Sequence, residues 1–293
     1  MHEGLSPGAQ TALLAWFDSR GRSLPFRAST DPYGILVSEV MAQQTQISRV
    51  ADRWGAFMAA FPSVQALAAA PAADVLRAWR GLGYNRRALN LQRAARAIVA
   101  EHGGVVPSSV AALERLPGIG PYSARAVASL AFGQRVGPVD TNVRRVLQRV
   151  VAADEPMSAS RLQAVADAVV PDERPAAWTH GLMDLGATTC RPTAPRCGEC
   201  PLQPWCAFAA GGARIPSRPK ARNAQPFAAT SRWVRGRILD RLRDAPGGEW
   251  VRIDAPIGAH DPDAVDGAVS ALEREGLLER HRHDPRLLRL PAV

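Results

Sequence analysis

Residues 113–146 have the sequence LERLPGIGPYSARAVASLAFGQRVGPVDTNVRRV, and this stretch decides the fold. Apolar residues at helical spacing stand on both sides of Pro117–Pro121, which predicts a helix, a glycine hairpin and a second helix. Gly118 and Gly120 can take positive φ without a Cβ clash, so backbone N–H groups can converge where the second helix begins. The helix dipole favours an anion there. The hairpin is therefore either a phosphate site or a tight helical turn that binds nothing.

Asp140 is the next residue of interest, twenty positions after Gly120 and within the run Pro138–Val143. It suits the N-cap of a helix beginning at Thr141, and it could also serve as a functional carboxylate; one side chain can do both. A dinucleotide-binding loop is excluded, because Ser123 stands where the third glycine would be and the preceding pattern is helical.

Composition places the chain in the all-α class. It has 293 residues, enough for two or three packed units, and 46% of them are apolar. Ala-rich helical patterns dominate, and alternating strand patterns are nearly absent. No run of about 18 apolar residues occurs, and the N-terminus has no basic segment followed by an apolar one, so we expect a cytoplasmic protein.

The formal net charge is +9, and almost all of the positive charge is arginine, since Lys220 is the single lysine. The planar guanidinium suits phosphate, so this balance favours a polyanionic partner. A bias toward GC-rich codons would also enrich arginine and alanine, and charge alone decides little.

A thiol cluster follows with the spacing C-x6-C-x2-C-x5-C, formed by Cys190, Cys197, Cys200 and Cys206. Four cysteines within seventeen residues do not form a framework of disulfides that holds a whole chain. Four thiolates suit a [4Fe-4S] cluster or a structural zinc, and the softness of sulfur does not choose between them. Zinc modules usually have two short C-x2-C pairs, whereas only one pair is short here.

A helix over Tyr33–Ile47 is predicted from YGILVSEVMAQQTQI. Glu39 lies within its apolar run, and helical spacing puts Gln43 one turn further on the same face. A carboxyl group held against apolar neighbours has a raised pKa, which suits a general acid working near neutral pH. The alternative is a solvated glutamate on an amphipathic helix.

Two motifs together resemble a known family. LPGIG, with its Gly/Pro-rich loop and Asp140, and SEVMAQQTQ at 38–46 are similar to the helix-hairpin-helix DNA glycosylases, in particular the MutY-type adenine DNA glycosylases. The resemblance runs from about residue 12 to 208. It implies that Glu39 protonates the adenine and helps to activate water. It also implies that Asp140 stabilises the cationic sugar of an extruded nucleotide, and that Gly118 and Gly120 hold backbone phosphate.

Further roles follow from the same resemblance. Gln44 falls where the family wedges a side chain into the base stack, and Thr45 where it contacts the base opposite adenine. Tyr84, in GLGY at 81–84, would intercalate as well, and Tyr122 would lie beside the reacting sugar. The cysteine spacing resembles the iron-sulfur loop of the family, which implies a [4Fe-4S] cofactor at 190–206. Further expected DNA contacts are Gln43, Asn142, Arg27, Arg191 and Arg196.

The implied reaction is hydrolysis of the N-glycosidic bond of adenine mispaired with 8-oxoguanine or guanine in double-stranded DNA, carried out by a monomer. The related endonuclease III branch has a lysine where Tyr122 stands, and Lys220 lies in a linker, so we expect no lyase activity. Two rivals remain: an endonuclease III-like glycosylase/lyase for damaged pyrimidines, and a non-catalytic iron-sulfur protein that binds DNA.

The sequence departs from the family at Phe26 (usually tryptophan), Ala42 (usually leucine) and Asn85 (often aromatic). The region 229–293 is also too short for the NUDIX-like domain that many members carry. Its helices near 231–243 and 262–275, followed by a small β-hairpin, predict a winged-helix-like unit. The expected organisation is one helical lobe at 28–140, a second formed by 1–27 with 141–208, a linker at 209–228, and the C-terminal unit at 229–293.

Overall fold

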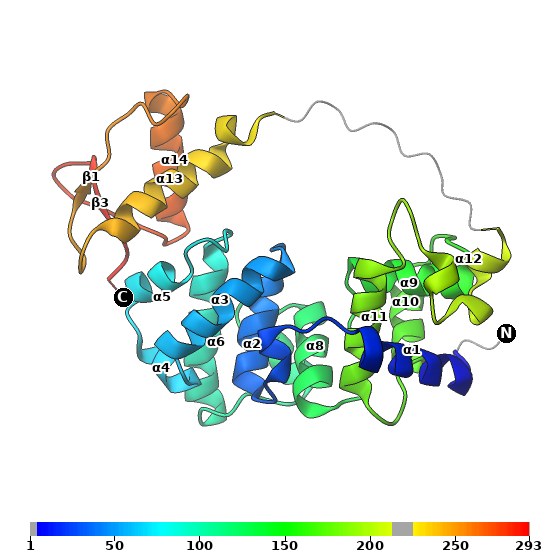
Figure 1. Ribbon diagram of the computed structural model, residues 1–293. Coiled ribbons are helices and arrows are strands. Elements are labelled where there is room, and N and C mark those ends of the chain that lie inside the picture. The colour runs from blue at the N-terminus through cyan, green and yellow to red at the C-terminus, as the bar shows by residue number, and fades with distance from the viewer. Residues whose placement is uncertain (1–4, 213–224, 293) are drawn as a thin grey trace. The chain divides into compact units, whose positions relative to one another are not determined.

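The computed structural model describes residues 5–212 and 225–292 of the chain. Helices dominate these residues, as the all-α class requires, and three short strands lie in the C-terminal region (Figure 1). Most of the predicted linker, including Lys220, lies outside the described residues. None of the helices in the described ranges is long and apolar enough to cross a bilayer.

The described chain forms two compact units. Unit 1 comprises Met1–Glu39, Val106–Arg115 and Ile119–Arg218, and unit 2 comprises Val40–Val105, Leu116–Gly118 and Pro219–Val293. Helix α2 (Pro32–Ala42) continues from unit 1 into unit 2. The lobe boundaries expected from the sequence stay a prediction.

Unit 1 is built from helices around one apolar core. Leu13, Leu147, Trp178 and Leu185 are all buried in this core. Its helices include α1 (Pro7–Arg20), η1 (Pro25–Ala28), α7 (Val110–Glu114), α8 (Pro121–Phe132), α9 (Thr141–Ala152), α10 (Ala159–Ala168), α11 (Pro175–Thr188), η2 (Cys197–Glu199), η3 (Gln203–Trp205) and α12 (Ala207–Ala210).

Local sequence signals begin and end several of these helices. The Ser6 and Ser158 side chains accept hydrogen bonds from backbone N–H groups in the first turns of α1 and α10. Gly133 ends α8 in the left-handed conformation at φ 63°, which glycine adopts without a Cβ penalty.

Unit 2 has a second helical core. Phe57 and Trp79 are both buried and meet edge to face, with ring centroids 5.8 Å apart. Its helices include α3 (Ile47–Ala60), α4 (Val64–Ala69), α5 (Ala72–Ala78), α6 (Arg86–His102), η4 (Phe227–Ala229), α13 (Ser231–Asp244) and α14 (Pro262–Arg274).

The C-terminal part of unit 2 has the order of elements expected of a winged-helix-like unit. Strands β1 (Val251–Arg252), β2 (Glu279–Arg280) and β3 (Leu287–Arg289) form an antiparallel sheet in the order β1-β3-β2. In the register, Leu288 pairs with Val251 on one side and with Arg280 on the other. Buried apolar side chains of α13 and α14 supply the small core of this part.

The predicted helix over Tyr33–Ile47 was too long, because α2 ends at Ala42 and α3 begins at Ile47. Between them Gln44 has φ 55°, a left-handed conformation that no helix continues. Gln43 therefore lies beyond the last turn of α2, and not on the helical face that Glu39 shares. The turn is held by hydrogen bonds from Arg87, a residue distant in the sequence.

Candidate active site

Glu39 lies near the C-terminal end of α2, and only 8% of the residue is exposed. The pKa of its carboxyl group is raised to about 7, chiefly by burial and in smaller part by the charge of Asp140. A hydrogen bond from Tyr122 and the charge of Arg27 act in the opposite direction, and lower it. Close to neutral pH this carboxyl group is therefore present in both the protonated and the ionised form, as a general acid requires.

One oxygen of the Glu39 carboxyl group, Oε2, is buried, and nothing within the described ranges forms a hydrogen bond with it. A buried polar atom without a partner costs about 1–3 kcal/mol, and such atoms are uncommon in folded proteins. This atom therefore has an unused capacity to form a hydrogen bond.

Tyr122 comes from the first turn of α8, and its hydroxyl is within hydrogen-bonding reach of the Glu39 carboxyl group. Burial raises the pKa of Tyr122 well above its ordinary value, and the neighbouring charges of Glu39 and Asp140 raise it further. The phenol stays protonated at every physiological pH, so it acts as a hydrogen-bond donor to the carboxyl group.

Asp140 is the N-cap of α9, as one of its two interpretations predicted. Its Oδ1 accepts hydrogen bonds from the backbone N–H groups of Asn142 (2.9 Å) and Val143 (2.7 Å). Its Oδ2 accepts one from the Asn142 side chain at 3.1 Å. Three donors thus hold the carboxylate in one orientation, and its charge raises the pKa of Glu39. The predicted contact of Asn142 with DNA stays a prediction.

Arg145 links this carboxylate to the cysteine loop, and sequence reasoning missed it. Its Nη2 donates to Asn142 Oδ1 at 2.8 Å and to the carbonyl oxygen of Gly186 at 2.7 Å. Its Nε donates to the carbonyl oxygen of Cys190, also at 2.7 Å. A guanidinium one turn after an N-cap is a weak sequence signal, because only the fold shows which carbonyl groups it reaches.

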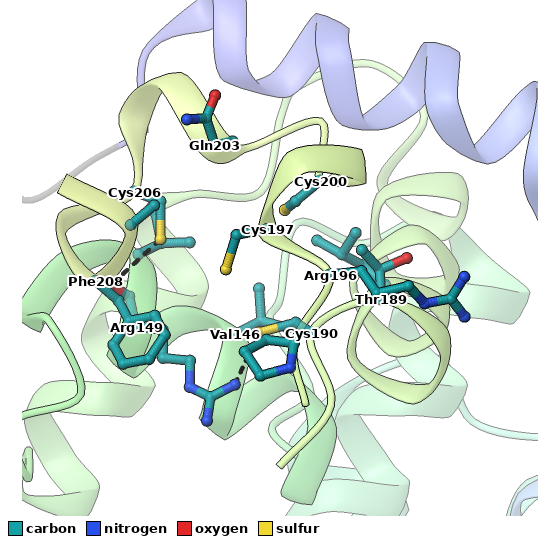
Figure 2. A pocket seen from close by; sticks show the side chains of 14 residues that line it. Val146, Arg149, Thr189, Cys190, Arg196, Cys197, Cys200, Gln203, Cys206 and Phe208 are labelled. Atoms are coloured by element: carbon teal, nitrogen blue, oxygen red, sulfur yellow. Dashed lines mark hydrogen bonds between the residues drawn. The ribbon is translucent and has the colours of Figure 1, made fainter. Parts of the chain in front are cut away.

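The four predicted cysteines line a single pocket in unit 1 (Figure 2). Their sulfur atoms face the same space, and the Nη1 atom of Arg149 lies 3.5 Å from the Cys190 sulfur. Burial raises the pKa of the Cys200 thiol to about 12. In the described ranges, no three side chains of His, Cys, Asp or Glu form a group positioned to hold a metal ion. The donor set is purely sulfur, which suits soft metals and iron-sulfur clusters.

Arg191 and Arg196 lie in the cysteine loop. Arg196 is partly exposed and forms an ion pair with Glu199 at 3.2 Å, and Arg191 donates to the carbonyl oxygen of Ala194 at 3.3 Å. Both of these contacts are local and exposed, so the guanidinium groups can exchange them for phosphate at little cost. Their predicted contact with DNA stays a prediction.

Arg27 forms an ion pair within the chain, and its predicted contact with DNA stays a prediction. Both of its Nη atoms donate to the buried carboxylate of Asp184, at 2.8 and 2.7 Å, and only 11% of its side chain is exposed. Arg22 binds the same carboxylate. The Arg27 charge does reach Glu39, whose pKa it lowers. The sequence could not identify Asp184 as the partner of Arg27, because the two are 157 residues apart.

In unit 2, the predicted wedge residues share one support, Arg87, which sequence reasoning also missed. Arg87 Nη1 donates to the carbonyl oxygens of Val40 and Met41, both at 2.8 Å, at the end of α2. Its Nη2 donates to Thr45 Oγ1 at 2.8 Å and to the carbonyl oxygen of Leu82 at 3.1 Å. One buried guanidinium therefore ties the turn after α2 to the GLGY loop.

Gln44 and Tyr84 are both exposed and both have positive φ, at 55° and 45°. A left-handed conformation costs a residue with a Cβ about 1–2 kcal/mol, so the surrounding contacts must hold it. Tyr84 exposes 42% of its surface, which is unusual for a large aromatic side chain. The two side chains that were predicted to enter a base stack are accordingly presented to solvent on strained turns.

The glycine hairpin needs one left-handed residue. Gly118 has φ 79°, and a Cβ there would lie 2.7 Å from the Cβ of Asn90, so only glycine fits. The Gly118 carbonyl oxygen accepts a weak hydrogen bond from the Gln43 side chain at 3.4 Å. Gly120 has φ −91° and is the N-cap of α8. The prediction that both glycines use positive φ is therefore wrong for Gly120.

Comparison with known proteins agrees with this architecture. The family described as "HhH-GPD superfamily base excision DNA repair protein" matches residues 37–172. Among solved structures, a thermostable thymine-DNA glycosylase is similar, with a TM-score of 0.65 and 29% sequence identity over 69% of this chain and 95% of that chain. The class defined by the fold and the site is thus that of helix-hairpin-helix base excision repair proteins.

Curated relatives define the family more narrowly. The adenine DNA glycosylase of Mycolicibacterium smegmatis is 44% identical over 272 residues, which cover 92% of each chain. That of Mycobacterium tuberculosis is 46% identical over 242 residues, 81% of this chain and 79% of the relative. The chain belongs to the adenine DNA glycosylase family.

Proposed function

We propose that this protein releases adenine from double-stranded DNA in which the adenine is paired with 8-oxoguanine or guanine. The observation that supports this most is the buried Glu39, with a pKa of about 7, beside Tyr122 and Asp140. Two carboxyl groups in different environments can have separate acid and electrostatic roles, as in other enzymes that cleave glycosidic bonds. The relatives from Mycolicibacterium smegmatis and Mycobacterium tuberculosis are adenine DNA glycosylases, which supports adenine as the base.

In the proposed reaction the protonated Glu39 gives its proton to the adenine. The bond between the sugar C1′ and the base breaks, and its electron pair leaves with the adenine. The carboxylate of Asp140, fixed by its three donors, stabilises the positive charge that develops on the sugar. Water then adds to the sugar carbon and gives a proton to the Glu39 carboxylate, which restores the acid.

Tyr122 keeps the Glu39 carboxyl group oriented in this scheme. Its phenol is a permanent donor, so it hydrogen-bonds the ionised form more strongly than the neutral one. It thereby limits how far burial raises the pKa of Glu39. The residue is a tyrosine and not an amine, so it cannot form a Schiff base with the sugar, and we propose simple hydrolysis without strand cleavage.

Extruding the adenine costs a few kcal/mol of stacking energy. Gln44 and Tyr84 would fill the space left in the stack, and Thr45 would contact the base opposite. The backbone at Gly118 would bind phosphate on the strand. Recognition of 8-oxoguanine would rest on these residues.

For the cysteine pocket we propose a [4Fe-4S] cluster held by Cys190, Cys197, Cys200 and Cys206. A thiolate at Cys200 needs a cation beside it, because burial disfavours its charge. When bound, the cluster would supply a rigid, cationic core for the loop that presents Arg191 and Arg196 to phosphate. Purified protein should contain iron and inorganic sulfide and absorb near 400 nm; a colourless protein containing zinc would contradict the assignment.

Single-turnover release of free base tests the proposed function. The duplexes carry 8-oxoguanine:A, G:A, 8-oxoguanine:C, G:T and thymine glycol, and the free base is identified by mass. The G:T duplex is included because a thymine-DNA glycosylase is 29% identical to this chain. Release of adenine from the first two duplexes is expected. Release of thymine or thymine glycol without adenine would replace the proposal by a pyrimidine glycosylase.

A further inference from the structure

The C-terminal part of unit 2 is docked on the helical part of the same unit. Helix α13 packs against α5 and against the loop that follows α5. Arg243, which is buried, donates from Nε to the carbonyl oxygen of Leu76 at 2.9 Å and from Nη2 to Asn85 Oδ1 at 2.6 Å. Arg77 in turn donates to the carbonyl oxygen of Ala245 at 3.1 Å. The contact thus uses buried, charge-assisted hydrogen bonds, which are about twice as strong as neutral ones.

This contact reaches the exposed aromatic residue of the GLGY loop. The guanidinium carbon of Arg232, in the first turn of α13, lies 5.0 Å from the centre of the Tyr84 ring. The guanidinium carbon of Arg87 lies 5.5 Å from the same ring. Both distances are within the range of cation–π attraction. The Tyr84 ring is therefore held by one arginine from its own part of the unit and by another from the C-terminal part.

Asn85, the neighbour of Tyr84, has a matching contact. Its amide oxygen accepts a hydrogen bond from Arg243. Two successive residues of the loop are thus bound by two arginines of one helix.

The other surface of the C-terminal part that could meet DNA is poorly suited to it. Helix α14 precedes the β-hairpin, the place where a helix-turn-helix protein has the helix that enters the major groove. Its exposed residues include Asp263, Asp266 and Glu273, with Arg274 as a single cation. Arg280 of β2 pairs with Asp266 at 3.1 Å and with Glu273 at 3.2 Å. The three carboxylates still outnumber the two guanidinium groups, which opposes approach to phosphate.

We propose that α13 braces the Tyr84 loop, with Arg232 as a positioning residue for the tyrosine ring. The proposal rests on the proposed function, in which Tyr84 enters the base stack. Holding the ring before DNA binds would reduce the conformational entropy lost on intercalation. The C-terminal part would then contribute to recognition through the tyrosine of the helical part, and not by contacting bases through α14.

The first test needs no catalysis. Hydrogen exchange of the peptide spanning residues 80–90 is followed in DNA-free, full-length protein for the parent, Arg232→Ala, Arg232→Lys and Arg237→Ala. Arg237 is the matched control, because it is an exposed arginine on the same helix and pairs with Asp240 one turn away. Exchange should become about two- to fivefold faster in Arg232→Ala, with Arg232→Lys between it and the parent. Equal exchange in Arg232→Ala and Arg237→Ala would overturn the proposal.

The second test asks whether Arg232 acts through Tyr84. Binding is measured to a duplex with a stable abasic-site analogue opposite 8-oxoguanine, for Arg232→Ala, Tyr84→Ala and the double variant. The Arg232→Ala substitution should weaken binding about two- to fivefold in the parent and have no effect in the Tyr84→Ala background. The same loss in both backgrounds would mean a direct phosphate contact, and would reject the brace. Absence of base release by the parent would reject the proposed function, and the exchange result would still decide the brace.

Discussion

Replacing Glu39 by glutamine should remove base release while stabilising the protein at alkaline pH. Glutamine has nearly the same shape and cannot supply a proton to a leaving base. Loss of a general acid costs about 100- to 10,000-fold in rate, so single-turnover release should fall by at least the lower of these factors. Binding to mispaired duplex should persist, since glutamine fills nearly the same space and the proposed wedge residues are unchanged.

The stability effect follows from the pKa. The carboxyl group titrates at 4.5 when exposed in the unfolded chain and at about 7 when folded. Folding thus favours the protonated form, and the contribution of this group is complete below pH 4.5 and lost as the pH rises through about 7. At about 1.36 kcal/mol per pKa unit, ionisation costs the folded state about 3 kcal/mol at pH 8 and less than about 1 kcal/mol at pH 5.

Thermal unfolding of the parent and of Glu39→Gln between pH 5 and pH 8 measures this difference. The variant should gain stability relative to the parent as the pH rises, and Glu101→Gln, at an exposed position on α6, should not. Parallel curves for Glu39→Gln and the parent would refute the argument that burial keeps Glu39 protonated. Base release by Glu39→Gln at close to the parental rate would refute its role as the acid.

Other changes test the remaining parts of the site. Asp140→Asn should keep the N-cap and the stability of the protein yet lose base release, whereas Asp140→Ala should also lose about 1 kcal/mol in thermal unfolding; base release by either at the parental rate would exclude Asp140 from catalysis. Tyr122→Phe removes a hydrogen bond that lowers the pKa of Glu39, so the fall in single-turnover rate with rising pH should begin at a higher pH than in the parent. Arg87→Ala should lower the thermal midpoint and speed exchange at residues 81–85, because several carbonyl groups lose their donor; unchanged exchange would contradict this. Cys197→Ala should lose bound iron and visible absorption, and full iron content would remove Cys197 from the ligand set.

Local signals were sufficient for much of the fold. The Asp140 cap, the Gly118 turn and the helical spacing of α13 and α14 are all determined by short stretches of sequence, and the structure has them where they were predicted. The pair Glu39 and Asp140, about 100 residues apart, could be predicted only through the resemblance to a family, because no local pattern joins them.

What the sequence could not predict depends on buried partners. The run QQTQ has no glycine or proline to mark the end of α2, and the turn at Gln44 exists because Arg87 binds the backbone around it. Arg27, Arg87 and Arg145 look alike in a chain rich in arginine. Only the fold shows that the first binds Asp184, that the second joins two loops, and that the third connects the Asp140 cap to the cysteine loop.

The titration of Glu39 itself tests the central claim most directly. Protein labelled with carbon-13 at the glutamate carboxyl group would be titrated by NMR, and the Glu39 signal identified by its absence from Glu39→Gln. A midpoint close to pH 7 is predicted from the burial of this group. A midpoint near its ordinary value of 4.5 would leave no acid to protonate adenine at neutral pH, and would contradict the mechanism.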